Sequence, residues 1–162
     1  MADMTRIFLH GLESSSRGRK AQFFRQNFGG MLTPDFTGDL NNRLARLREI
    51  LQDTTDLIMV GSSFGGLMAA IYGLEYPDKV KKLILLAPAL NFPDFSAWQG
   101  RTSHIPTALF IGRHDTVTPP GPVVDAAGAT FTNLTVSLLD DDHLLSKSFL
   151  LLEWQKMLQN CL

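Results

Sequence analysis

The chain has 162 residues, of which 44% are hydrophobic and 19% are charged, and its formal net charge at pH 7 is −1. This predicts one soluble globular domain, residues 1–162, and argues against a nucleic-acid or membrane partner, since both favour an excess of lysine and arginine. The single cysteine, Cys161, excludes an internal disulfide, and because no charged leader precedes a long apolar segment, we expect a cytoplasmic protein.

Short apolar runs alternate along the chain with stretches of helical periodicity. In chain order, the first half predicts a strand at Thr5 to Leu9, a helix at Arg17 to Phe28, a weaker strand near Met31 to Thr33, and a helix at Asp39 to Gln52. The second half predicts strands at Leu57 to Val60, Lys82 to Ala87, Thr107 to Ile111 and Leu134 to Leu139, and helices at Phe64 to Glu75, Pro119 to Gly128 and Leu144 to Leu158. This alternation predicts an α/β protein, a three-layer α/β/α sandwich with a mostly parallel sheet.

Two features do not enter this pattern. The basic clusters, which include Arg43, Arg46 and Arg48 on one predicted helix, are interpreted as solvated faces balanced by acidic residues elsewhere. The stretch from Ala89 to Ile105 is rich in aromatic residues and too short for a separate domain. We expect it to be a loop that could overhang a site as a lid.

The most specific motif is Gly61-Ser62-Ser63-Phe64-Gly65, which lies between an apolar strand and a predicted helix. A G-x-S-x-G sequence in this context forms a sharp, strained turn that presents the central serine hydroxyl. Glycines flank the serine because larger side chains would collide with the adjoining strand and helix. Ser63 is therefore the candidate nucleophile, against the alternative of a serine in a structural glycine turn.

Residues that could act together in catalysis follow several predicted strands. They would lie at the carboxyl ends of the strands, where parallel sheets bind their ligands. His10 follows the first predicted strand, Ser63 the third, Asp115 the fifth and His143 the last. A serine hydroxyl needs an imidazole to take its proton, and the imidazole needs a carboxylate to fix its tautomer. We assign these roles to Ser63, His143 and Asp115. His10 is expected to brace its loop by a hydrogen bond, and His114 to lie on the rim.

Alternatives remain at this site. Asp140, Asp141 and Asp142 adjoin His143 and could orient it instead of Asp115, although adjacent side chains seldom face each other, and we interpret the run as a solvated turn. His114, Asp115, Asp142 and His143 could also imitate a metal site, but no ligand pair has helical spacing such as H-E-x-x-H, and the serine elbow would then have no purpose. We expect no metal and no cofactor.

The four placed motifs together resemble the α/β-hydrolase superfamily, whose triad follows the chain order serine, acid, histidine. They are Leu9-His10-Gly11, the Ser63 elbow, Gly112-Arg113-His114-Asp115-Thr116-Val117-Thr118-Pro119 and Asp142-His143. The short length and the opening Leu9 to Ser15 look like the small YqiA-type esterases. Many members begin with two further strands and insert a cap domain before the strand at Thr107. Here the resemblance implies a minimal core, with a sheet of about six strands and no cap domain.

The resemblance also implies an oxyanion hole, formed by the NH of Phe64 and of Leu12, with the NH of Gly11 as the fallback. Glu13 and Ser14 are expected to face the acyl pocket. The aromatic residues Phe92, Phe95 and Trp98 would either line that pocket or cover core, and Phe92 and Trp98 are the candidates for substrate contact.

These residues predict a serine hydrolase that cleaves esters or thioesters of a small-molecule acyl substrate through an acyl-enzyme. Amide or lactone hydrolysis is an alternative, because the same triad serves all these reactions. A non-catalytic ligand-binding or partner-binding protein on the same fold is another. The presence of all three triad residues argues against that last alternative.

Overall fold

A computed structural model of the protein describes residues 3–159, and Cys161 lies outside them. Five parallel strands form one sheet in the order β1-β2-β3-β4-β5. They are β1 (Thr5–Leu9), β2 (Leu57–Ser62), β3 (Val80–Leu86), β4 (Thr107–Gly112) and β5 (Leu134–Leu139). The five main predicted strands are therefore confirmed, and all pairings between them are parallel.

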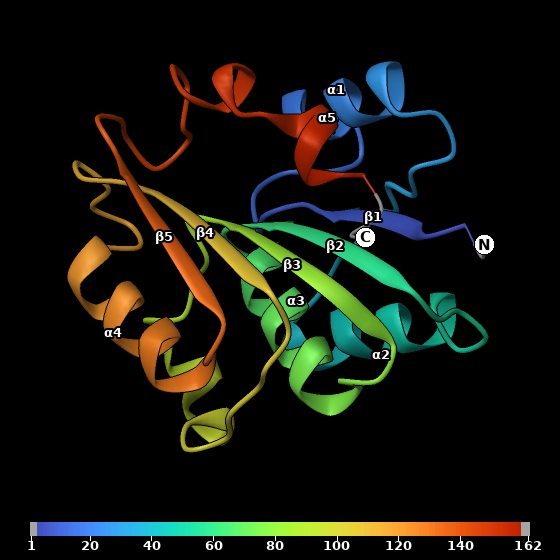
Figure 1. Ribbon diagram of the computed structural model, residues 1–162, viewed down its shortest axis with the longest axis horizontal. Helices are drawn as coiled ribbons and strands as arrows, with labels where there is room; N and C mark the ends of the chain where they lie inside the picture. The colour runs from blue at the N-terminus through green and yellow to red at the C-terminus, as the bar shows by residue number, and fades with distance from the viewer. Residues whose placement is uncertain (1–2, 160–162) are drawn as a thin grey trace.

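Helices cover both faces of the sheet, which makes the three predicted layers (Figure 1). One face carries α1 (Arg19–Asn27), the short 3-10 helix η2 (Phe149–Leu151) and α5 (Trp154–Met157). The other face carries α2 (Leu40–Ile50), α3 (Phe64–Glu75), the 3-10 helix η1 (Pro93–Trp98) and α4 (Pro120–Thr130). In Figure 1, α1 and α5 lie above the sheet and α2, α3 and α4 below it.

The strands divide their side chains between two apolar cores, one on each face. Leu83 and Leu85 of β3 point into the core under α2, α3 and α4, and Ile84 points into the core under α1 and α5. This is the period of two expected for a strand. Because both faces are buried, both sets of positions are apolar, and the strands appear in the sequence as continuous apolar runs.

The predicted sixth strand is only a single bridge, Ile7 with Leu32, at the edge beside β1. Two hydrogen bonds hold it, from Phe8 NH to the Leu32 carbonyl and from Leu32 NH to the Arg6 carbonyl, each 2.9 Å long. Glycines precede this segment, and Pro34 follows it without an NH for the ladder. These neighbours confine pairing to one residue, so the sheet has five strands rather than about six.

The predicted helix from Leu144 to Leu158 is wrong in its extent. The structure has η2 and α5, separated by Leu152 in an extended conformation (φ −70°, ψ 150°). The buried residues Phe149 and Trp154 pack against each other with ring centroids 5.2 Å apart. Trp154 also donates its indole NH to the Phe149 carbonyl at 2.8 Å. The apolar spacing in the sequence thus reflects packing onto α1 instead of a continuous helix.

The segment between β3 and β4 adds no domain to the fold. It contains η1, and Phe95 at its centre is fully buried in the core on the α3 side. No cap domain is inserted at this position, as the sequence predicted.

Candidate active site

The turn from β2 into α3 holds Ser63 in a strained backbone conformation, with φ 54° and ψ −114°. A side chain on Gly61 would collide with the carbonyl of Gly65, and one on Gly65 would collide with the carbonyl of Leu9. Both glycines are thus required for the close approach of β1, β2 and α3. A positive φ at a non-glycine residue costs on the order of 1–3 kcal/mol and clusters at functional sites. The elbow therefore has the geometry that its sequence predicts.

Ser63, His143 and Asp115 form one hydrogen-bonded chain. The Ser63 hydroxyl lies 3.0 Å from Nε2 of His143, and Nδ1 of His143 lies 2.7 Å from Oδ2 of Asp115. A carboxylate only accepts, so Nδ1 carries the proton and Nε2 is free to accept from the serine hydroxyl. The three residues come from the carboxyl ends of β2, β4 and β5. The structure thus brings together the three residues that the sequence singled out.

The loop after β4 holds the Asp115 carboxylate rigidly. Oδ1 accepts from the NH groups of Val117 and Thr118 at 2.9 and 2.7 Å, and the Thr118 hydroxyl donates to Oδ2 at 2.7 Å. The Asp115 side chain is fully inaccessible to solvent. No role was assigned to Thr118 from the sequence, although an aspartate at the start of a turn often accepts hydrogen bonds from the residues that follow it.

The acidic run after β5 is not a uniform solvated turn. Asp141 is buried, and its carboxylate accepts the NH groups of Asp142, Lys147 and Ser148 at 2.8, 3.0 and 2.8 Å. Burial alone would raise the pKa of Asp141, but these hydrogen bonds outweigh it and hold the pKa at about 2. Asp141 thus organises the loop on which His143 lies.

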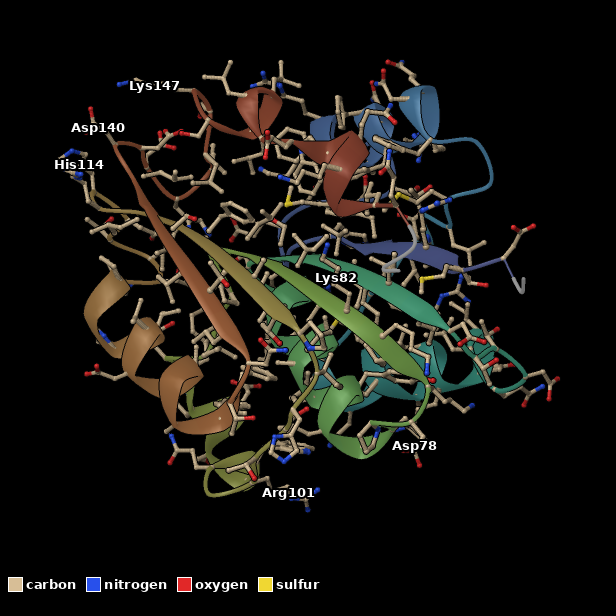
Figure 2. All side chains as sticks on the ribbon, in the orientation of Figure 1. Asp78, Lys82, Arg101, His114, Asp140 and Lys147 are labelled. Carbon is tan, nitrogen blue, oxygen red and sulfur yellow. The ribbon has the colours of Figure 1, made fainter. Side chains whose placement is uncertain are left out.

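Asp140 lies at the exposed rim and makes its contact outside the triad. Its carboxylate is 2.9 Å from Nε2 of His114, and both side chains are largely exposed. Figure 2 shows this pair at the ends of β4 and β5, with Lys147 nearby. The hydrogen bond from His114 holds the pKa of Asp140 below its usual range. His114 therefore occupies the rim position expected from the sequence.

The loop after β1 lies against Ser63. A Cβ on Gly11 would be 3.5 Å from the Ser63 Cβ. Buried His10 lies behind this loop, with Nδ1 2.8 Å from the Gly11 carbonyl, and Nε2 accepts the Phe36 NH at 2.9 Å. The proton is therefore on Nδ1, which donates to Gly11. Because the Gly11 carbonyl and the Leu12 NH share one trans peptide, this bond also fixes the direction of the Leu12 NH.

Among the described residues, the NH of Phe64, at the first position of α3, and the NH of Leu12 make no hydrogen bond with another part of the chain. The amino terminus of α3 also concentrates partial positive charge at this point. The arrangement is suited to an oxygen atom that gains negative charge next to Ser63.

A cavity of about 620 Å³ opens at the serine. Three of the four residues predicted to contact substrate line it, namely Glu13, Ser14 and Phe92. Trp98 is not among the residues that line it and packs against the core on the α3 side, which is the second of the two alternatives that the sequence left open. The segment from Ala89 to Ile105 therefore contributes one wall residue, Phe92, rather than a folded lid.

The opposite wall comes from α1 and the segment after β5, which the sequence did not associate with the site. It combines the apolar residues Ala21, Leu144, Leu145 and Phe149 with Arg19, Lys20 and Ser146, and Phe8 of β1 lines the cavity as well. Lys20 joins the two segments, because its ammonium group donates to the Leu144 carbonyl at 2.8 Å. Burial lowers the pKa of Lys20, and the neighbouring Arg19 lowers it further.

Two properties of residues 3–159 concern metal binding and membrane spanning. No group of three or more His, Cys, Asp or Glu side chains gathers there in a way that could hold a metal ion. Among the same residues, no helix combines the length and hydropathy needed to cross a membrane.

The chain belongs to the family with the alpha/beta hydrolase fold, whose sequence model matches residues 9–105, more than half of the chain. A search of curated protein sequences finds no match.

Several solved structures are similar over most of their length. A hydrolase-superfamily protein from Xanthomonas campestris pathovar campestris has 26% identity and a TM-score of 0.73, covering 91% of each chain. The monoacylglycerol lipase of Paleococcus ferrophilus has 15% identity and a TM-score of 0.65, covering 85% of each chain. Est1E of Butyrivibrio proteoclasticus, in a structure with bound ferulic acid, has 16% identity and a TM-score of 0.70, covering 92% of this chain and 84% of that one. Family membership supports hydrolase activity in general, and the structural neighbours support the fold.

Proposed function

We propose that the protein is a serine hydrolase that cleaves a carboxylic ester or thioester of a small acyl group through an acyl-enzyme. The observation that carries this proposal is the unbroken hydrogen-bonded chain from Ser63 through His143 to Asp115, which begins at a strained elbow and opens into a cavity. A serine that is only part of a structural turn needs neither the aligned imidazole nor the buried carboxylate behind it.

In the acylation step, the Ser63 oxygen attacks the carbonyl carbon of the substrate while Nε2 of His143 takes the hydroxyl proton. The carbonyl oxygen becomes an oxyanion that accepts from the NH groups of Phe64 and Leu12. Asp115 keeps the His143 ring oriented and stabilises its charged form. His143 then gives its proton to the leaving alcohol or thiol, and the acyl-enzyme remains.

In the deacylation step, a water molecule replaces the leaving group. Nε2 of His143 takes one proton from the water, whose oxygen attacks the acyl carbonyl carbon and forms a second oxyanion in the same position. Collapse of this intermediate breaks the bond to the Ser63 oxygen, which recovers its proton from His143. The products are the carboxylic acid and the free enzyme, so all atoms balance.

The cavity supports an acyl substrate with an apolar body. Its lining combines Phe8 and Phe92 with the apolar residues Leu144, Leu145 and Phe149 of the segment after β5, and α1 adds Ala21 beside Arg19 and Lys20. Its volume of about 620 Å³ lies within the range of pockets for small organic ligands. Two structural neighbours are consistent with such a substrate, because one is a monoacylglycerol lipase and the other, Est1E, was solved with ferulic acid bound. Glu13 lines the cavity and would disfavour a substrate carboxylate placed beside it, whereas Arg19 and Lys20 in the same lining would favour one.

Labelling with a fluorophosphonate probe tests the proposal, with peptide mass analysis to locate the adduct. We expect an adduct on Ser63 that disappears in Ser63→Ala. Ser62→Ala, which changes the neighbouring serine, is the matched control and should still be labelled. Folded protein that resists the probe would oppose the proposal and favour a binding protein on the same fold. Positive labelling leads to a comparison of p-nitrophenyl esters and thioesters of increasing acyl length.

A further inference from the structure

Arg43 on α2 is a buried cation without a carboxylate partner. The residue is 4% exposed, and none of the ion pairs among residues 3–159 includes it. Its Nη1 is the one buried side-chain nitrogen or oxygen in this part of the chain that makes no hydrogen bond. Burial lowers the pKa of Arg43, but a guanidinium stays protonated in proteins. Arg43 therefore keeps a buried positive charge that lowers the stability of the fold, and such a charge is expected to have a function.

The guanidinium of Arg43 contacts both residues whose NH groups form the candidate oxyanion site. Its Nη2 donates to the Leu12 carbonyl at 3.4 Å, and its Cζ lies 5.4 Å from the ring centroid of Phe64. Nε donates to the Gly38 carbonyl at 2.9 Å, which anchors the side chain at the start of α2. In Figure 1, α2 lies beside α3 on the same face of the sheet.

Arg43 does not line the cavity, whereas Leu12 and Phe64 do. It therefore lies behind the candidate oxyanion site, on the side away from substrate. His10 holds the carbonyl of Gly11 from behind, and Arg43 holds the next carbonyl, that of Leu12. Two consecutive peptides of this short loop are thus fixed from within the protein. A nearby positive charge that no carboxylate neutralises also favours negative charge at the reacting oxygen.

We infer that Arg43 is a positioning residue of the oxyanion site: it holds the Leu12–Glu13 peptide, which directly follows the peptide that carries the Leu12 NH, and its unneutralised charge favours the oxyanion. This inference rests on the proposed function and adds a residue that touches neither the substrate nor the triad. Because the oxyanion exists only in the transition state and intermediate, Arg43 should affect kcat and leave KM nearly unchanged.

The test compares Arg43→Met with the wild type in hydrolysis of p-nitrophenyl butyrate and in inhibition by phenylboronic acid, which forms an anionic tetrahedral adduct with an activated serine. Methionine removes the charge and the donors but preserves length. Arg48→Met is the matched control, since Arg48 lies on the same helix and pairs with Glu75 at 2.7 Å. We expect kcat and boronate affinity to fall by about tenfold or more in Arg43→Met, with KM and the control within about twofold.

A structural role alone would lower stability and not transition-state binding, so the melting temperature is measured in parallel. We expect only a small change in Arg43→Met, because removal of an unpaired buried charge offsets the loss of the hydrogen bonds to the Gly38 and Leu12 carbonyls. Should that variant not fold, Arg43→Gln tests the same charge. An active wild type with unaffected kcat and boronate affinity in the folded variant overturns this inference alone. A wild type that neither hydrolyses the ester nor reacts with the fluorophosphonate overturns the proposed function and this inference together.

Discussion

The loops after β4 and β5 each contain a buried carboxylate, and the two carboxylates do different things. Asp115, after β4, accepts backbone NH groups of its own loop through Oδ1 only, and its Oδ2, which also accepts from the Thr118 hydroxyl, lies 2.7 Å from Nδ1 of His143. Asp141, after β5, turns both oxygens to backbone NH groups of its own loop. Burial is common to both carboxylates. What separates a candidate triad acid from a loop organiser is whether an oxygen remains available for the imidazole.

The two buried carboxylates hold different parts of His143. His143 lies in the loop that Asp141 holds, two residues beyond it, and its ring is oriented by Asp115 from the neighbouring loop. One carboxylate thus fixes the backbone of the histidine and the other fixes its ring. Variants of the two residues should therefore differ in which property they change.

The largest effect is expected for Asp115→Asn. The amide keeps an oxygen for the NH groups of Val117 and Thr118, but it no longer provides a carboxylate to stabilise the charged imidazole. We expect kcat for an ester to fall by roughly 10³–10⁴-fold, with a thermal unfolding midpoint close to that of the wild type. Steady-state kinetics and calorimetry measure the two quantities. Near-normal turnover in a folded variant would remove Asp115 from the triad.

A smaller effect on activity and a larger one on stability are expected for Asp141→Asn. The amide oxygen is a weaker acceptor for the NH groups of Lys147 and Ser148 than a carboxylate is, so the loop loosens. We expect the free energy of unfolding to fall by roughly 1–2 kcal/mol and kcat by about tenfold to a hundredfold. Urea unfolding and ester kinetics provide the measurements. A loss of kcat as large as that of Asp115→Asn would erase the distinction between the two loops.

The pH dependence of stability should sharpen the same contrast. The pKa of Asp141 is about 2 in the folded protein, below its ordinary value of 3.8. Its stabilising contribution is therefore fully present above pH 3.8 and is lost as the pH falls toward 2. Asp141→Asn should flatten this acid limb of a urea-unfolding series, because the amide does not titrate. An unchanged acid limb would show that Asp141 is not held as a carboxylate by its loop.

Much of the site was predictable because a parallel sheet places the carboxyl ends of its strands at one edge. Ser63, Asp115 and His143 are far apart in sequence, yet each follows a strand that the apolar pattern identifies. Strand identity and the elbow motif were therefore enough to bring the three residues together. The apolar strands and the elbow are local sequence patterns, and pairing of the strands in one parallel sheet brings the residues that follow them together.

What the sequence did not predict depends on contacts between irregular segments. Asp141 is buried because its carboxylate collects NH groups up to seven residues away in a loop without regular structure. Leu144 to Leu158 has apolar spacing that a helix would explain, but the spacing comes from packing of Phe149 and Trp154 onto α1. Neither periodicity nor motif encodes such contacts.

Arg43 shows the same limit within a regular element. It was interpreted with Arg46 and Arg48 as part of a solvated face, and α2 is indeed a helix where the pattern predicts one. Arg43 is nevertheless buried, because Leu12 and Phe64 approach α2 on the side where it lies. A basic residue on an amphipathic helix is assigned to solvent by its charge alone, and only tertiary contacts reveal the exception.

The smallest effect is expected for Asp140→Asn, which completes the set of carboxylates near His143. Asp140 is exposed and pairs with His114, and hydrogen bonding from His114 lowers the pKa of Asp140. An exposed pair of this kind is screened by solvent and salt. We expect kcat and the unfolding midpoint to stay within experimental error of the wild type, measured at low and high salt. A clear loss of kcat would mean that the exposed carboxylate of Asp140 acts on His143. The assignment of Asp115 as the acid, which rests on its buried oxygen beside the imidazole, would then be wrong.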